Sequence, residues 1–205
     1  MNLANTLVLI AGPALMVAGW VLLISNIGRG ANDSWAFGHL ILFAANASWI
    51  PATLILRAAA GENAAPRMWI VAFGFVLIGS LAIAGQLAID LAAWALSLDA
   101  ASLTPFFEAM RSRGVLSLLV YVGGPPLLFA GLVVAWLELG RSRPDYRPWT
   151  FVGAGGLGLV LVGALTTFSY VILSGYVVAL FGAIGIARHY YRSHAQRAFA
   201  TARAV

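Results

Sequence analysis

The feature that most constrains the fold is a continuous apolar stretch from Met68 to Leu96, long enough to cross a bilayer as one helix. Similar stretches recur along the chain, and hydrophobic residues make up 61% of it. Backbone groups in hydrocarbon must be paired internally, so only helices or a closed barrel can span a membrane. Barrel strands are short and alternate in polarity, whereas these stretches are long and continuous. The sequence therefore predicts an all-α polytopic membrane protein.

The apolar stretches predict one transmembrane domain over residues 1–205, built as a six-helix bundle. The last apolar region, Trp149 to Ala187, is too long for one span, and Ser174-Gly175 is its strongest turn signal. A break nearer Ser169-Tyr170 is the alternative. The expected helices span approximately residues 3–27, 35–56, 68–96, 115–139, 150–173 and 175–198.

The arginines predict the orientation. The chain has twelve basic residues, all arginine. Six helices place nine of them with the two termini and three on the other side, so the positive-inside rule puts both termini in the cytoplasm. We expect a multi-pass protein of a prokaryotic plasma membrane, the inner membrane where there are two. This orientation accounts for the net charge of +5 without nucleic acid as a partner.

A short internal similarity indicates a second level of organisation. Gly12-Pro13 matches Gly124-Pro125, and Ala18-Gly19 matches Ala130-Gly131 at the same spacing. Two three-helix units of opposite topology would follow, an arrangement common in transporters. The alternative is chance, because Gly, Ala, Leu and Val dominate the chain.

Polar side chains gather in the outer half of the predicted bundle. Opposite helix directions place His39 and Asp90 at similar depth, with Gln86 one turn from Asp90 and Asn46 near the midplane. Ionisable residues inside a membrane are functional candidates, so we expect these four to bind a ligand or proton. The alternative is that Asp90 pairs with His39 or a loop arginine and only fixes two helices, with Asn46 forming an interhelical hydrogen bond.

Further polar residues lie at the outer helix ends, and we expect them to line a cavity open to that side: Asn26, Thr166, Thr167 and Tyr170. The loop before the fourth helix contains an amphipathic segment over 104–112, with Thr104 as its cap and Pro105 in its first turn. It predicts an interfacial helix that acts as a lid or as a connector. At the inner end, Glu138 is expected to pair with an arginine.

Several chemistries are excluded or disfavoured by composition. The chain has no cysteine and no lysine, which excludes thiolate metal sites and a phosphate-binding loop with lysine. His39 is the only histidine at membrane depth, so a bis-histidine haem is not expected. One histidine, one aspartate and two amides make a poor metal site. We therefore expect no metal and no cofactor, and an enzyme is disfavoured.

Three function classes remain. The first is a transporter, or its substrate-binding subunit, that binds a small molecule, lipid or ion. Ala14 and Ala18 resemble the small-residue docking face in substrate-binding subunits of energy-coupling-factor transporters, which also have six helices, although the loop after the first helix is shorter here. The second is a non-catalytic scaffold subunit of a larger membrane complex or homo-oligomer, and the third an intramembrane enzyme using Asp90 and His39. Membrane lipids are partners in all three.

Overall fold

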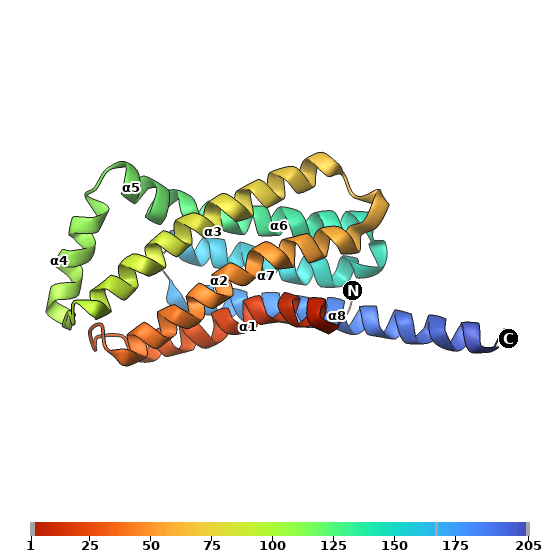
Figure 1. The fold of residues 1–205 in the computed structure, drawn as a ribbon, viewed down its shortest axis with the longest axis horizontal. Coiled ribbons are helices and arrows are strands. Elements are labelled where there is room, and N and C mark those ends of the chain that lie inside the picture. The colour runs from red at the N-terminus through yellow and green to blue at the C-terminus, as the bar shows by residue number, and fades with distance from the viewer. Residues whose placement is uncertain (1–2, 167, 204–205) are drawn as a thin grey trace.

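The computed structural model describes residues 3–166 and 168–203, and these contain helices and no strand (Figure 1). Six of the helical segments are long and apolar enough to cross a membrane. The helical prediction is confirmed, and the six segments indicate a multi-pass membrane protein.

The first three spans are α1 (Leu3–Ser25), α2 (Asp33–Ala60) and α3 (Pro66–Ala95). Helix α2 begins two residues earlier than predicted because the Asn32 side chain caps it, accepting a hydrogen bond from the Trp35 backbone N–H at 3.1 Å. It continues to Ala60, followed by a single 3₁₀ turn, η1 (Gly61–Asn63).

The fourth span is irregular at its outer end. A short α5 (Val115–Ser117) leads into a π-helical turn, η2 (Leu118–Gly123), and then into α6 (Gly124–Ser142). Pro125 and Pro126 have no N–H, and their rings would crowd the carbonyls one turn earlier in a regular helix. The wider π turn relieves this, and the Gly124 N–H bonds to the Leu119 carbonyl five residues back.

The predicted break at Ser174-Gly175 is wrong. After a 3₁₀ turn, η3 (Pro144–Tyr146), helix α7 runs Arg147–Thr166 and α8 runs Ser169–Arg203. Gly175 lies inside α8, where a Cβ would come within 2.6 Å of the Gly156 carbonyl oxygen. This glycine permits close helix packing rather than a turn, and the break lies near the alternative position.

The outer connecting helix α4 spans Ala100–Arg111. The prediction that Thr104 caps it is wrong. Asp99 is the cap, and its carboxylate accepts a hydrogen bond from the Ser102 N–H at 2.8 Å. Pro105 therefore lies within the helix rather than in its first turn. Asp99 lies five residues before Thr104, so the helix begins about one turn earlier than predicted.

The Asp99 cap predicts a pH-dependent helix start. Hydrogen bonds from the Ser102 side chain and backbone lower the pKa of the Asp99 carboxyl from its ordinary 3.8. The capping contribution is therefore present above pH 3.8 and is lost as the pH falls through the lowered pKa. We expect Asp99→Ala to reduce amide-exchange protection at the start of α4 at neutral pH, with Glu108→Ala as the control. Equal protection in the two variants would contradict the assignment.

The six spans form a closed ring. Neighbours in sequence pack together in the order α1, α2, α3, α6, α7 and α8, and α8 returns to pack against α1. Figure 1 shows the start of α1 and the end of α8 at the same end of the bundle, with α8 extending beyond it. We call this the basic end, because the helix ends and the turn that carry Arg57, Arg67, Arg141, Arg143 and Arg147 lie there. The opposite end carries the α1–α2 loop and α4.

Three tryptophans occupy the core. Trp49 and Trp136 are 1% and 0% exposed, and Trp69 is buried as well. From sequence alone, these residues resemble the aromatic belt of a membrane protein. That interpretation is wrong for these three, because their rings fill space between helices beside small residues such as Gly153. Trp94 and Trp149 are more than one-third exposed, as belt residues are.

Candidate functional site

His39 of α2 and Asp90 of α3 lie together, which agrees with the similar depth predicted for them. His39 Nε2 is 3.4 Å from Asp90 Oδ2. Both residues are buried, His39 at 4% and Asp90 at 8% exposure. The two helices run antiparallel side by side, so residues near the start of α2 face residues near the end of α3 (Figure 1). An ionisable pair is thus enclosed between two membrane-spanning helices.

The surroundings of His39 determine where its proton lies. Its Nδ1 is 2.8 Å from the Trp35 carbonyl oxygen, which can only accept a hydrogen bond. Nδ1 must therefore carry a hydrogen, which leaves Nε2 to face the Asp90 carboxyl. If Nε2 and the carboxylate were both unprotonated, their lone pairs would face each other in a buried place and repel. The contact is favourable when one proton lies between Nε2 and Oδ2, carried by either residue.

Trp35 contacts both residues of this pair. Its Nε1 donates to the Asp90 carbonyl at 3.1 Å, and its ring centroid is 4.4 Å from that of His39. The Phe107 ring of α4 also approaches Trp35, to 6.3 Å between ring centroids. From sequence alone, the place of Trp35 at the start of a helix resembles that of the aromatic belt of a membrane protein. The sequence signal for its contact with His39 is their spacing of four residues, because residues i and i+4 share a helix face.

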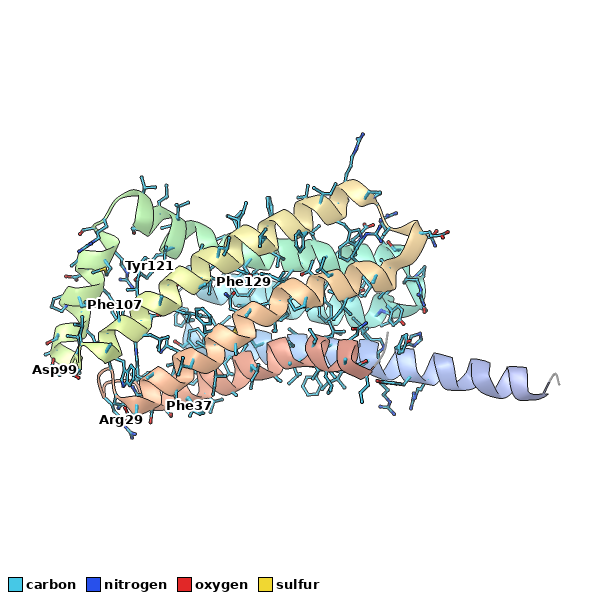
Figure 2. The ribbon with its side chains drawn as sticks, in the orientation of Figure 1. Arg29, Phe37, Asp99, Phe107, Tyr121 and Phe129 are labelled. Atoms are coloured by element: carbon cyan, nitrogen blue, oxygen red, sulfur yellow. The ribbon has the colours of Figure 1, made fainter. Side chains whose placement is uncertain are left out.

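Tyr121 of η2 is a second residue that sequence reasoning missed. Its hydroxyl is buried and has no hydrogen-bond partner among the described residues. The phenol lies within electrostatic reach of Asp90 and of Arg111, whose guanidinium carbon is 5.6 Å from the ring centroid. Figure 2 labels Tyr121 and Phe107 in the outer part of the bundle. The sequence indicates its position only through Pro125 and Pro126, which follow it and shift the helix register at this depth.

Asn46 forms the interhelical hydrogen bond that its position predicted. Its Nδ2 donates to the Ser80 carbonyl of α3 at 2.9 Å. The Asn46 Oδ1 and the Ser80 hydroxyl are buried and have no partner in the described part of the chain. Asn46 lies seven residues beyond His39, a rise of about 10 Å, so it is not part of the histidine–aspartate contact.

Gln86 is half-buried one turn from Asp90, and within the described ranges no hydrogen bond joins it to the pair. Of the four expected site residues, His39 and Asp90 therefore contact each other, and Asn46 forms a separate hydrogen bond. Gln86 lies near the pair but takes no part in its described contacts. This difference follows from side-chain reach, which spacing along a helix does not specify.

The residues expected to line an outer cavity lie elsewhere. Asn26 is buried in the α1–α2 loop, where its Nδ2 donates to the Gly30 carbonyl and its Oδ1 accepts from Asn32. The Thr166 hydroxyl donates to the Val162 carbonyl of its own helix, and Tyr170 is 69% exposed on the bundle surface. Thr167 lies outside the described residues. The polar groups of Asn26 and Thr166 form hydrogen bonds within the α1–α2 loop and within α7, and Tyr170 lies on the surface.

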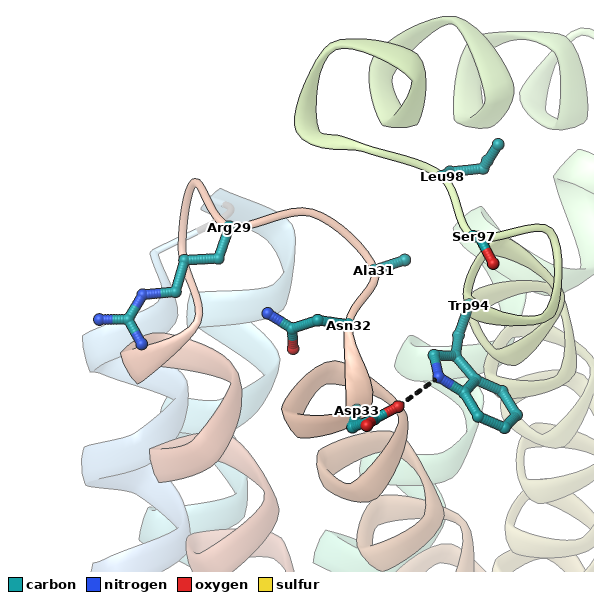
Figure 3. A pocket seen from close by; sticks show the side chains of 7 residues that line it. All are labelled: Arg29, Ala31, Asn32, Asp33, Trp94, Ser97 and Leu98. Carbon is teal, nitrogen blue, oxygen red and sulfur yellow. Dashed lines mark hydrogen bonds between the residues drawn. The ribbon is translucent and has the colours of Figure 1, made fainter.

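A different set of residues forms a pocket at the end of the bundle opposite the basic end, shown in Figure 3. It has a volume of about 350 Å³ and lies between the α1–α2 loop and the turn after α3. Trp94 Nε1 donates to Asp33 Oδ1 at 3.1 Å, and the Ala31 N–H donates to the Leu98 carbonyl at 3.0 Å. The lining residues are Arg29, Ala31, Asn32, Asp33, Trp94, Ser97 and Leu98.

The pocket and the buried pair are neighbours along both helices. Asp33 comes two residues before Trp35, and Trp94 comes one turn after Asp90. In Figure 3 the Arg29 side chain points away from Trp94, so Asp33 is the charged group closest to that indole.

The side chains at the site supply an imidazole, carboxylates, an amide and a phenol. No cluster of three or more potential ligands from His, Asp and Glu occurs within the described residues. The histidine–aspartate pair by itself supplies two ligands, fewer than transition-metal sites use.

Comparison with protein-family models, with curated proteins and with solved structures found no match.

Proposed function

We propose that this chain is a membrane transport protein, or the substrate-binding subunit of one. In this proposal the His39–Asp90 pair exchanges a proton, and the outer pocket receives a small solute or ion. The basic end faces the cytoplasm of a prokaryotic cell by the positive-inside rule. The observation that carries the proposal is the buried 3.4 Å contact between Nε2 and Oδ2, with Nδ1 committed to a carbonyl.

The position of the pair supports exchange with the outer side. It lies within two helical turns of the pocket-lining residues Asp33 and Trp94. The Phe107 ring of α4 is 6.3 Å from the Trp35 ring between centroids, and we expect movement of α4 or of the Trp35 ring to open the pair to the pocket. Tyr121 and Arg111 are the titratable groups that approach from the neighbouring elements η2 and α4.

The second candidate is a non-catalytic scaffold subunit. One observation favours it: side chains of α2 donate hydrogen bonds to backbone carbonyls of α3 and so hold these helices together. Trp35 Nε1 binds the Asp90 carbonyl, and Asn46 binds the Ser80 carbonyl. In this reading the pair holds its proton permanently and does not exchange it.

The protonation of the pair can be measured directly. The chain has three histidines, so ¹⁵N-histidine NMR of the full protein gives few signals, and His39→Gln assigns those of His39. We expect Nδ1 to carry a hydrogen and the Nε2 signal to change in Asp90→Asn. An unprotonated Nδ1 would contradict the hydrogen-bond argument.

Transport can be tested in proteoliposomes with a trapped pH indicator. Pools of amino acids, sugars, organic acids and polyamines are added outside, and luminal pH is followed. We expect one pool to drive proton movement, and Asp90→Asn or His39→Gln to reduce it by about a hundredfold, the lower end of the range for losing an acid–base group. Glu108→Gln, an exposed carboxylate of α4, is the matched control.

A scaffold would give the opposite result. No pool would move protons, Asp90→Asn would melt as the wild type does, and a partner membrane protein would remain bound through purification. That combination would overturn the transport proposal.

A further inference from the structure

The second large hollow of the molecule is an apolar groove near the basic end, between the end of α2 and the start of α3. Its volume is about 520 Å³. We call it the α2–α3 groove. Its lining residues are Thr53, Leu54, Arg57, Pro66, Trp69, Ile70, Phe73 and Gly74.

The groove opens to the lipid-facing surface. Leu54 and Ile70 line it and are 53% and 72% exposed. A Cβ on Gly74 would meet no atom within 4 Å, so this glycine leaves the groove unfilled by protein. An apolar hollow of this kind does not hold ordered water, because water needs several polar partners. In a bilayer, the available apolar occupant is a lipid acyl chain.

The charge at one end of the groove specifies the kind of lipid. Arg57 lines it, and its Nη1 donates to the Gly61 carbonyl at 3.1 Å, which keeps the guanidinium at the basic end. A guanidinium has five donors and binds phosphate well. Pro66 begins α3, so the positive end of that helix also borders the groove. None of the lining residues is acidic.

We infer that the α2–α3 groove binds an anionic phospholipid of the inner leaflet, with an acyl chain along Leu54, Ile70 and Gly74 and the phosphate at Arg57. A zwitterionic phospholipid would fill the apolar part equally well. Its cationic headgroup, however, would lie at a bundle end already rich in arginine. This inference concerns a site at the opposite end from His39 and Asp90, and it does not depend on the proposed function.

The test compares lipids and matched variants of the full-length protein in nanodiscs. Phosphatidylglycerol and phosphatidylcholine are the probes, read out by retained lipid in native mass spectrometry and by melting temperature. We expect wild-type protein to retain phosphatidylglycerol and to melt higher in it. Arg57→Gln should bind it about fivefold more weakly, the effect of about 1 kcal/mol for one interfacial charge. Arg147→Gln, also an exposed arginine of the basic end, should behave as the wild type.

A second pair of variants tests the groove itself. A Cβ on Gly74 meets no atom within 4 Å, and we expect Gly74→Leu to place its side chain in the groove and to abolish retention of the bound lipid. A Cβ on Gly155 also meets no atom within 4 Å, but Gly155 lies on α7 outside the groove, so Gly155→Leu should have no effect. Equal retention in these two variants, or equal loss in Arg57→Gln and Arg147→Gln, would overturn the inference.

Discussion

Gly175→Val is expected to lower the melting temperature of the bundle by about 5–10 °C, from about 3 kcal/mol of overpacking in a chain of this size. A Cβ on Gly175 would come within 2.6 Å of the Gly156 carbonyl oxygen and 2.7 Å of the Val160 nitrogen. Both are backbone atoms, so α7 and α8 would have to separate rather than repack a side chain. Lipid tails fill the resulting gap less well than the close contact of two backbones.

The control for this experiment is Gly155→Val, because a Cβ there meets no atom within 4 Å. Both variants place a β-branched residue inside a helix, so their difference reports the packing alone. The measurement is thermal unfolding in detergent, followed by tryptophan fluorescence. If Gly175→Val and Gly155→Val have the same melting temperature, then Gly175 does not lie at the α7–α8 contact.

The second large effect is expected at Glu138, on the basic end of α6. This carboxylate is buried at 5% exposure and pairs with Arg141, as the sequence predicted. Its Oε1 also accepts from the Ala65 backbone N–H at 2.7 Å and from the Ser142 hydroxyl at 3.2 Å. Ala65 immediately precedes α3, so Glu138 ties the α2–α3 loop to α6.

Glu138→Ala should therefore cost about 2 kcal/mol, because it removes charge-assisted hydrogen bonds and leaves the Ala65 N–H without its acceptor. Glu138→Gln should cost less, since its amide oxygen can still accept from Ala65. Glu62→Ala removes an exposed carboxylate from the same loop and serves as the control. Thermal unfolding and hydrogen exchange at the start of α3 would measure the effect. Equal stability of the Glu138 and Glu62 alanine variants would show that Glu138 does not hold the loop.

The partial success of the sequence at the candidate site has a physical explanation. Helix direction and orientation convert position into depth, so His39 and Asp90 could be placed level with each other. Lateral position is different, because it depends on how far each helix rotates about its axis. Asn26, Thr166 and Tyr170 have suitable depths, but their side chains are engaged in a loop, in a helix end and on the surface.

The amino-acid sequence by itself determined the class of protein, the number of spans and the distribution of arginine between the two ends. These follow from local properties: hydrophobic length, the need to pair backbone groups, and charge in loops. Only the tertiary structure decided that Gly175 is a packing position, that Trp49 and Trp136 are core residues, and that His39 shares its environment with Trp35. Each depends on which helix lies opposite, and the same glycine or indole suits either a turn or a contact until that neighbour is known.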